Sequence, residues 1–251
     1  MRRALLVTCL LALGALPASA WTGSLMESLG RDARKLLPRS LARLMAEREP
    51  LMNEEVRRFP ATLSQAMAAD LSSGELRPET LSALEAEGAS AVDLLRRQYL
   101  TAGLIRLGGI LRISADLTDP VLAAGPEGYP PGVAREYYAF IEANLGKIPV
   151  VVVDGENALK LERKELPGYW RDLLGRSRPQ APVIRTGLFR NGRVVDYRTI
   201  DFRSPVFGVA QIAYSRAVTA IAGTWLALWR DANGDLTRMP KPREVKPEDR
   251  P

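Results

Sequence analysis

The sequence predicts a mostly α-helical protein with a single multi-helix domain and one small β-hairpin. Along most of the 251-residue chain, apolar residues recur at the spacing of about 3.6 residues that is typical of amphipathic helices. A long stretch at 204–230 is apolar on nearly every side, which favours a helix in the centre of the core. The dipeptide Asn191-Gly192, with apolar residues on either side, is typical of a tight turn and predicts the hairpin near 183–200.

The helices expected in the first half of the chain begin or end at proline and glycine. Pro38 closes the first helix, Pro60 opens the third and Gly74 ends it, because proline fits the first turn of a helix and glycine often follows the last. Another helix starts at Pro78 and is expected to end near Gly88, before a longer one. The expected ranges are 25–37, 41–50, 60–74, 78–88 and 92–117.

In the second half, helices alternate with loops. Prolines and glycines make 125–132 a loop, and a helix at 133–145 and a brief extended run at 150–153 follow. The apolar stretch at 204–230 could alternatively span a membrane, but Arg216 interrupts it and the uncharged part is short. A helical domain at 21–235 is thus expected to precede a flexible, solvated tail at 236–251.

Residues 1–20 have the layout of a secretory signal peptide. Arg2 and Arg3 precede an apolar run, and Ala18-Ser19-Ala20 supplies the small residues that signal peptidase requires. We expect cleavage after Ala20 and a mature protein that begins at Trp21 in the periplasm or outside the cell. An uncleaved anchor is the alternative, although the apolar run is short for a membrane span.

The composition is that of a globular protein and excludes several function classes. Hydrophobic residues make up 46% and charged residues 25%, and the formal charge is +6, which becomes +6 − 2 = +4 without Arg2 and Arg3. There is no histidine, which excludes Ser-His-Asp hydrolysis and any zinc site that needs imidazole. The single cysteine, Cys9, lies in the segment expected to be removed, so disulfides and a thiol nucleophile are not expected. No basic block with interleaved aromatic residues indicates nucleic-acid binding.

One motif lies at the end of the long helix at 92–117. The sequence there reads Arg112-x3-Asp116-x3-Pro120-x-Leu122, where x is any residue. This resembles the His-x3-Asp-x3-Pro-x-His pattern of the zinc-dependent phospholipase C and single-strand nuclease superfamily, in which the i, i+4 spacing puts the first His and the Asp on one helix face. Asp116 and Pro120 match that pattern, whereas Arg112 and Leu122 occupy the two histidine positions.

The start of the expected mature chain carries a second resemblance. In that superfamily a mature N-terminal Trp binds zinc through its free amine and carbonyl oxygen, and a His follows shortly. Trp21 matches this residue, and Met26 stands in place of the His. A weaker match puts Ala134 and Tyr138 at the positions of a His-x3-Glu or His-x3-Asp ligand pair. The resemblance implies a multi-helix fold and an ancestral trinuclear zinc cluster that activates water for attack on a phosphodiester.

The residues at these former metal-site positions do not suit zinc. Leucine and alanine cannot bind a metal, methionine is a poor zinc ligand and arginine repels cations. We therefore expect no metal and an Arg112–Asp116 ion pair in its place, with a solvated surface pair as the alternative. The simplest alternative to the resemblance is that Asp116 and Pro120 are only a helix cap and a helix breaker.

Weaker signals are more simply explained as structure. The segment 231–235 resembles the start of a calcium loop, but Pro242 at its twelfth position cannot be a bidentate ligand, so a helix-ending turn is expected. Asp154 and Glu156 could pair as in a glycosidase, which needs two carboxylates at a set separation. Three tryptophans on apolar stretches are expected in the core, namely Trp170, Trp225 and Trp229.

These observations predict a secreted, non-catalytic relative of zinc-dependent phospholipase C that acts as a binding or structural module in the bacterial cell envelope. Its mild basic charge favours anionic lipid head groups or other envelope components as partners. The alternative is a phosphodiester hydrolase with a reduced or altered metal site that uses Trp21 and Asp116, the one case in which zinc would be a cofactor. A carboxylate-only enzyme such as a glycosidase is the third possibility.

Overall fold

The computed structural model describes residues 21–239 apart from residues 60, 126–127 and 154. These residues are mostly helical and contain one two-stranded antiparallel sheet, so the predicted mostly helical class with a small hairpin is confirmed. The predicted signal peptide at 1–20 and residues 240–251 of the predicted tail lie outside the described residues.

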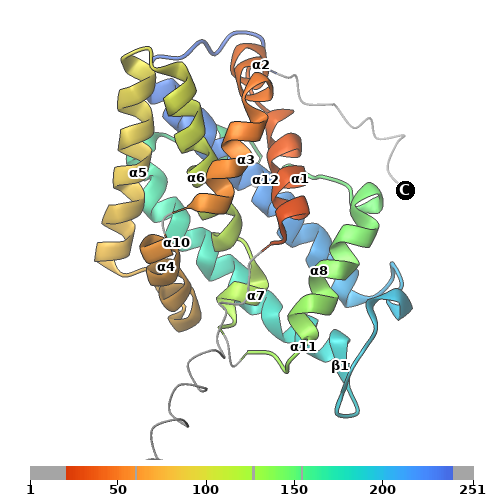
Figure 1. Cartoon of the computed structure of the whole chain (residues 1–251). Coiled ribbons are helices and arrows are strands. Elements are labelled where there is room, and N and C mark those ends of the chain that lie inside the picture. The colour runs from red at the N-terminus through yellow and green to blue at the C-terminus, as the bar shows by residue number, and fades with distance from the viewer. Residues whose placement is uncertain (1–20, 60, 126–127, 154, 240–251) are drawn as a thin grey trace, which may run out of the picture.

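The elements follow one another with short connections (Figure 1). The first half of the chain contains α1 (Gly23–Arg34), α2 (Arg39–Glu47), α3 (Glu49–Arg58), α4 (Ala61–Ser73), α5 (Pro78–Arg96), α6 (Leu100–Leu117) and α7 (Pro120–Ala123). The second half contains α8 (Val133–Asn144), α9 (Gly155–Lys160), α10 (Leu166–Ser177), α11 (Ala181–Leu188), β1 (Phe189–Arg190), β2 (Arg193–Val194) and α12 (Pro205–Asp231). Short 3₁₀ turns are η1 (Leu145–Lys147), η2 (Arg163–Glu165), η3 (Arg178–Gln180) and η4 (Tyr197–Thr199).

The long helix α12 is the centre of the core. It packs against α1, α5, α6, α9 and α11, and it crosses the molecule diagonally in Figure 1. The indole Nε1 of Trp225 donates a hydrogen bond to the carbonyl of Leu107 on α6 at 2.8 Å. Among the described residues, α12 alone is long and apolar enough to cross a membrane, yet 72% of its most apolar window is buried inside the structure. The prediction of a core helix at 204–230 is therefore confirmed, and all three predicted core tryptophans are buried.

Three helix boundaries differ from those expected, and one of them is the start of the helix predicted at 92–117, which begins only at Leu100. The predicted end near Gly88 is wrong, because α5 continues through it to Arg96. Gly88 lies where α5 meets α12, and a Cβ there would be 3.3 Å from Leu228, so this glycine permits close packing instead of ending the helix. The chain turns at Gln98, whose φ is +62°. The helix predicted at 41–50 also ends sooner, at Glu47. Pro50 instead lies in the first turn of α3, where its missing N–H is not needed.

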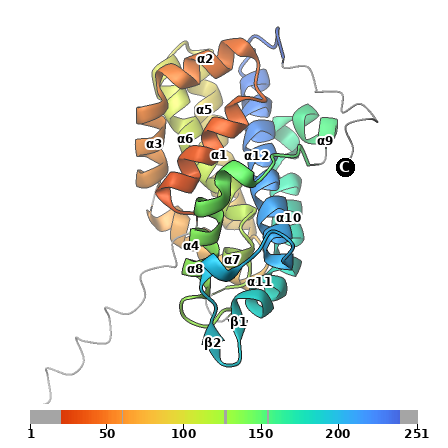
Figure 2. The same ribbon diagram turned by 90° about the vertical axis from the view of Figure 1, so that its right-hand side faces the viewer.

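The hairpin is shorter than predicted (Figure 2). Residues 181–188 form α11, whose Ile184 and Leu188 are buried, so only Phe189–Val194 and Arg190–Arg193 pair across the sheet. Asn191 and Gly192 have φ of +52° and +74°, as the predicted turn requires. The run at 150–153 is not a strand, since the amides of Val151 and Val153 donate to Ser215 and Thr219 on α12.

Candidate functional site

Three segments that are far apart in the sequence meet at the C-terminal end of α6. Trp21 is 2% exposed, and its indole Nε1 donates to the carbonyl of Ala115 at 3.0 Å. The Trp21 ring lies 6.2 Å from the ring of Tyr138 on α8. The hydroxyl of Tyr138 in turn donates to Oδ2 of Asp119 at 2.7 Å. We call Trp21, Arg112, Asp116, Asp119 and Tyr138 the Arg112 cluster.

The ion pair expected at this place is present. Nε of Arg112 donates to Oδ2 of Asp116 at 2.7 Å, one helical turn away, and the two side chains are 22% and 3% exposed. The pair is therefore not the solvated surface pair that was the alternative. Within the described part of the chain, Oδ1 of Asp116 has no hydrogen-bond partner. Burial raises the pKa of Asp116 to about 6, although the charge and the hydrogen bond of Arg112 lower it.

Asp119 is a member of the cluster that the sequence interpretation missed. It is fully buried, and its Oδ1 caps α7 by accepting a hydrogen bond from the amide of Val121 at 2.8 Å. An Asp directly before a Pro is a common helix start, so the Asp119-Pro120 pair was the signal that could have found it. The capping residue at this site is thus Asp119 and not Asp116. Burial raises the pKa of Asp119 to about 7, and the nearby charge of Asp116 also raises it.

Burial is the main cause of both raised pKa values, and the charge of Asp116 adds to the shift of Asp119. Both carboxylates are buried, and only Asp116 forms an ion pair with the partly exposed Arg112. A second ionised carboxylate would leave one net negative charge buried, which is unfavourable. Asp119 therefore retains a proton up to about neutral pH, and the cluster stays close to electrically neutral.

We expect Asp119→Asn to reduce the loss of stability on going from pH 5 to pH 8. The folded-state pKa of about 7 is above the ordinary 3.8, so Asp119 contributes stability that is full below about pH 4 and is lost as the pH rises through 7. Asn keeps an oxygen for the Val121 amide and never ionises. Urea unfolding gives the free energy of unfolding of both proteins at each pH. The difference, variant minus parent, should be about 2–4 kcal/mol larger at pH 8 than at pH 5.

The exposed Asp93→Asn on α5 is the matched control, because its side chain is 63% exposed. It should leave the pH dependence of the parent unchanged. If the parent and Asp119→Asn lose the same free energy of unfolding between pH 5 and pH 8, the pKa of Asp119 is not raised in the folded protein.

The other positions that the resemblance assigns to a metal site are apolar. Met26 on α1 is buried in the hydrophobic core, and Leu122 on α7 and Ala134 on α8 pack against that core while partly exposed. Within the described residues there is no group of three or more His, Cys, Asp or Glu side chains that could hold a metal ion. Where the segments that carry the resemblance meet, the polar side chains that come together are therefore those of the Arg112 cluster.

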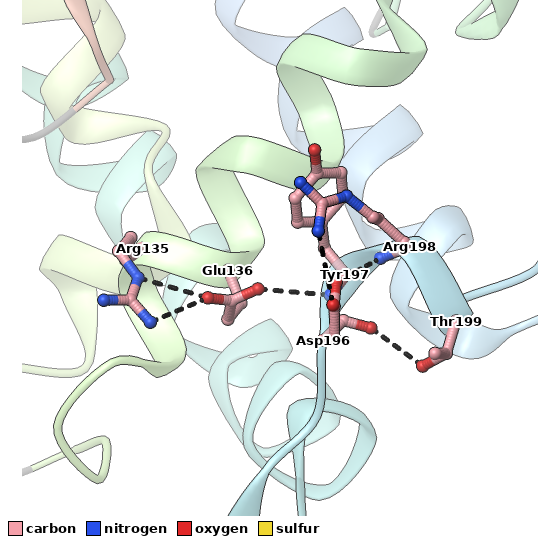
Figure 3. Close-up of polar contacts among 6 residues, drawn as sticks. All are labelled: Arg135, Glu136, Asp196, Tyr197, Arg198 and Thr199. Atoms are coloured by element: carbon pink, nitrogen blue, oxygen red, sulfur yellow. Dashed lines mark hydrogen bonds and ion pairs between the residues drawn. The ribbon is translucent and has the colours of Figure 1, made fainter.

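The position of α8, which carries Tyr138, is set by contacts with the chain after the hairpin (Figure 3). Glu136 accepts hydrogen bonds from the Arg135 guanidinium at 2.9 and 3.1 Å and from the amide of Tyr197 at 3.2 Å. Asp196 caps η4 by accepting from the amide of Arg198 at 2.9 Å. The bond between Glu136 and the Tyr197 amide joins α8 to η4, so it helps to hold α8 and its Tyr138 in place.

A cavity of about 570 Å³ adjoins the cluster through Tyr214. The ring of Tyr214 lies 6.4 Å from that of Trp21, and its hydroxyl donates to Asp32 at 2.9 Å. Asp32 also pairs with Lys35 at 2.6 Å, and Arg34 pairs with Glu49 at 3.2 Å. Arg31 is the third cation of the lining and donates to the Ser28 hydroxyl at 2.9 Å, so its charge is the one that favours an anionic occupant. The lining residues are Ser28, Arg31, Asp32, Arg34, Lys35, Ala42, Leu145, Gly146 and Tyr214.

The weaker signals have structural roles or lie outside the description. Asp231 forms ion pairs with Arg96 at 3.2 Å and Arg163 at 2.7 Å at the end of α12, and Asn233 has a φ of +58°, as in a helix-ending turn. Asp154 lies outside the described residues, and the side chain of Glu156 is not described.

The fold and the cluster define a class of protein: a helical protein with one hydrophobic core in its described residues, in which Arg112 pairs with a buried carboxylate beside Trp21. No protein-family model matches the sequence, and comparison with curated proteins and with solved structures gives no match either.

Proposed function

We propose that the chain is a non-catalytic relative of the zinc-dependent phospholipase C and single-strand nuclease superfamily that acts as a binding module in the cell envelope. One observation carries the proposal. The segments with the sequence resemblance, around Trp21, at Arg112–Pro120 and at Tyr138, converge on a single polar cluster although they are up to 117 residues apart (138 − 21 = 117).

The Arg112 guanidinium supports the non-catalytic part of the proposal. It binds the one carboxylate that matches a ligand of the superfamily, and its fixed charge repels a metal cation. Trp21, Asp116 and Asp119 are all at most 2% exposed, so substrate and bulk water do not reach the carboxylates in this conformation. The same burial disfavours a glycosidase that would use these two acids. The cluster then serves to dock the N-terminal segment on α6 and α8.

The basic cavity supports the binding part of the proposal. Trp21 packs on Tyr214, and Tyr214 holds Asp32 in the cavity wall, so the docked N-terminal segment shapes the cavity. Arg31 and Lys35 are exposed there and can reach an anionic group. The phosphate of a lipid head group fits this chemistry, because cations beside a polar cavity attract and hydrogen-bond its oxygens.

The catalytic alternative is tested with the full chain, expressed in a bacterial host that exports it. Mass spectrometry should show a mature chain that begins at Trp21. After dialysis against zinc, elemental analysis should find far less than one zinc per chain, and a phosphodiester substrate should be hydrolysed at the background rate. Stoichiometric zinc together with hydrolysis that a chelator abolishes would overturn the proposal and favour the hydrolase.

The binding part is tested by sedimentation with phosphatidylcholine vesicles, with and without phosphatidylglycerol. Binding should need the anionic lipid and weaken about tenfold in Arg31→Ala, which removes a charge-assisted contact. Arg171→Ala on α10 removes the same charge from an exposed site away from the cavity and should bind like the parent. Equal loss in both variants would show that only the net charge matters.

A further inference from the structure

A second cavity lies between the start of α2 and the chain that follows α12. Its volume is about 450 Å³, within the range of small-molecule sites. Three guanidinium groups, two hydroxyls and one carboxylate line it, from Arg39, Ser40, Arg43, Asp235, Thr237 and Arg238. Neither the resemblance nor the proposed function uses this cavity.

The loop after α12 is held in a defined shape. The carbonyl of Asp235 accepts hydrogen bonds from the Trp229 indole at 3.0 Å and from the Ser40 hydroxyl at 3.2 Å. Arg238 has a φ of +59°, a backbone region that residues other than glycine, asparagine and aspartate rarely adopt. This backbone brings Arg238 to the cavity that Arg39 and Arg43 line from α2. Unfavourable backbone geometry of this kind is often retained at functional sites.

The charges in the cavity are unbalanced. The Asp235 carboxylate is occupied within its own loop, where it accepts a hydrogen bond from the amide of Thr237 at 2.8 Å. Arg43 has Glu47 at 3.9 Å, and the charge of Arg238 helps to lower the pKa of Asp235. Arg39 forms no ion pair of 4.0 Å or less with a described residue. Three cations that share one cavity repel each other, and an anion between them would remove this repulsion.

We propose that this cavity binds a phosphate or diphosphate group. The planar guanidinium fork matches phosphate oxygens in bidentate fashion, and the Ser40 and Thr237 hydroxyls can donate further hydrogen bonds. A phosphate group offers three oxygens, so it can accept hydrogen bonds from several of these guanidinium groups at once, whereas a carboxylate has only two oxygens. This inference is independent of the proposed function, because neither the residues that line the 570 Å³ cavity at Arg31 nor those of the Arg112 cluster take part in it.

The experiment titrates the full chain with inorganic pyrophosphate by isothermal calorimetry at low salt. Arg39→Ala and Arg238→Ala should each weaken binding about 10- to 100-fold, as expected for the loss of charge-assisted hydrogen bonds. Arg193→Ala, an exposed arginine in the hairpin, removes the same charge and should leave binding unchanged. Circular dichroism checks that each variant is folded.

Three results would overturn the proposal. The first is no heat of binding at millimolar pyrophosphate, and the second is an equal loss of affinity in Arg193→Ala. The third is a loss of affinity in Arg31→Ala without one in Arg39→Ala, which would put the ligand in the other cavity.

A second arm uses vesicles that contain phosphatidic acid. Vesicle binding that needs Arg39 and is competed by pyrophosphate identifies a lipid phosphate as the source, and binding of free pyrophosphate alone identifies a soluble phosphate compound.

Discussion

Replacing Arg112 with methionine is expected to lower the free energy of unfolding by about 3–5 kcal/mol at pH 7. Methionine keeps most of the packing volume but removes the charge. Asp116 is then a buried carboxylate with no counter-ion, since its Oδ2 depends on Arg112 and its Oδ1 has no partner among the described residues. Urea unfolding measures the loss. It should be smaller at pH 5, because the pKa of Asp116 is about 6 even with Arg112 present.

The matched control is Arg58→Met on α3. Arg58 pairs with Glu54 at the same i, i+4 spacing, but the two side chains are 73% and 43% exposed, so its loss should be at most about 1 kcal/mol. The double variant Arg112→Met/Asp116→Leu should recover most of the stability, because both charges are removed together. If Arg112→Met costs no more than Arg58→Met, water reaches the cluster and the ion pair is not desolvated.

Trp21→Ala is expected to cost about 3–5 kcal/mol, as for other large buried aromatic residues. The indole is 2% exposed, contacts the rings of Tyr138 and Tyr214, and donates to the Ala115 carbonyl. Its removal leaves a cavity between α6, α8 and α12. The measurement is urea unfolding, with near-ultraviolet circular dichroism to follow the packing of the tyrosines.

Two further variants separate the contributions of Trp21. Trp21→Phe keeps an aromatic ring but loses the N–H donor, and it should cost about 1–2 kcal/mol. Phe202→Ala removes a 47% exposed ring that contacts only Phe207 and Lys147 among the ring contacts of the described residues, and it should cost no more than about 1.5 kcal/mol. A stable Trp21→Ala would mean that the N-terminal segment does not dock at the end of α6. The convergence on which the proposed function rests would then be lost.

Local patterns in the sequence were sufficient for the helical class and for some boundaries. The uninterrupted apolar character of 204–230 predicted the core helix, since a helix that is apolar on all sides must be buried. Gly74, predicted as a stop, has a φ of +84° directly after α4. The spacing of Arg112 and Asp116 put both on one face of α6, so their ion pair was predictable from the helix period alone.

Local patterns were misleading where a long-range contact decides the outcome. Gly88 signals a helix end in isolation, but in the fold it lets α5 approach Leu228 of α12. The apolar residues after position 182 suit a strand or a helix equally well, and burial of Ile184 against the core selects the helix.

The sequence by itself determined the helical class, the Asn191-Gly192 turn and the absence of imidazole, because each depends on residue type or on neighbours within a few positions. Only the tertiary structure decided that Trp21 and Tyr138 lie beside the end of α6, that Asp119 is buried with a raised pKa, and that Arg238 shares a cavity with Arg39. The physical reason is that burial and electrostatic interactions depend on distances in space, and residues far apart in the chain set those distances.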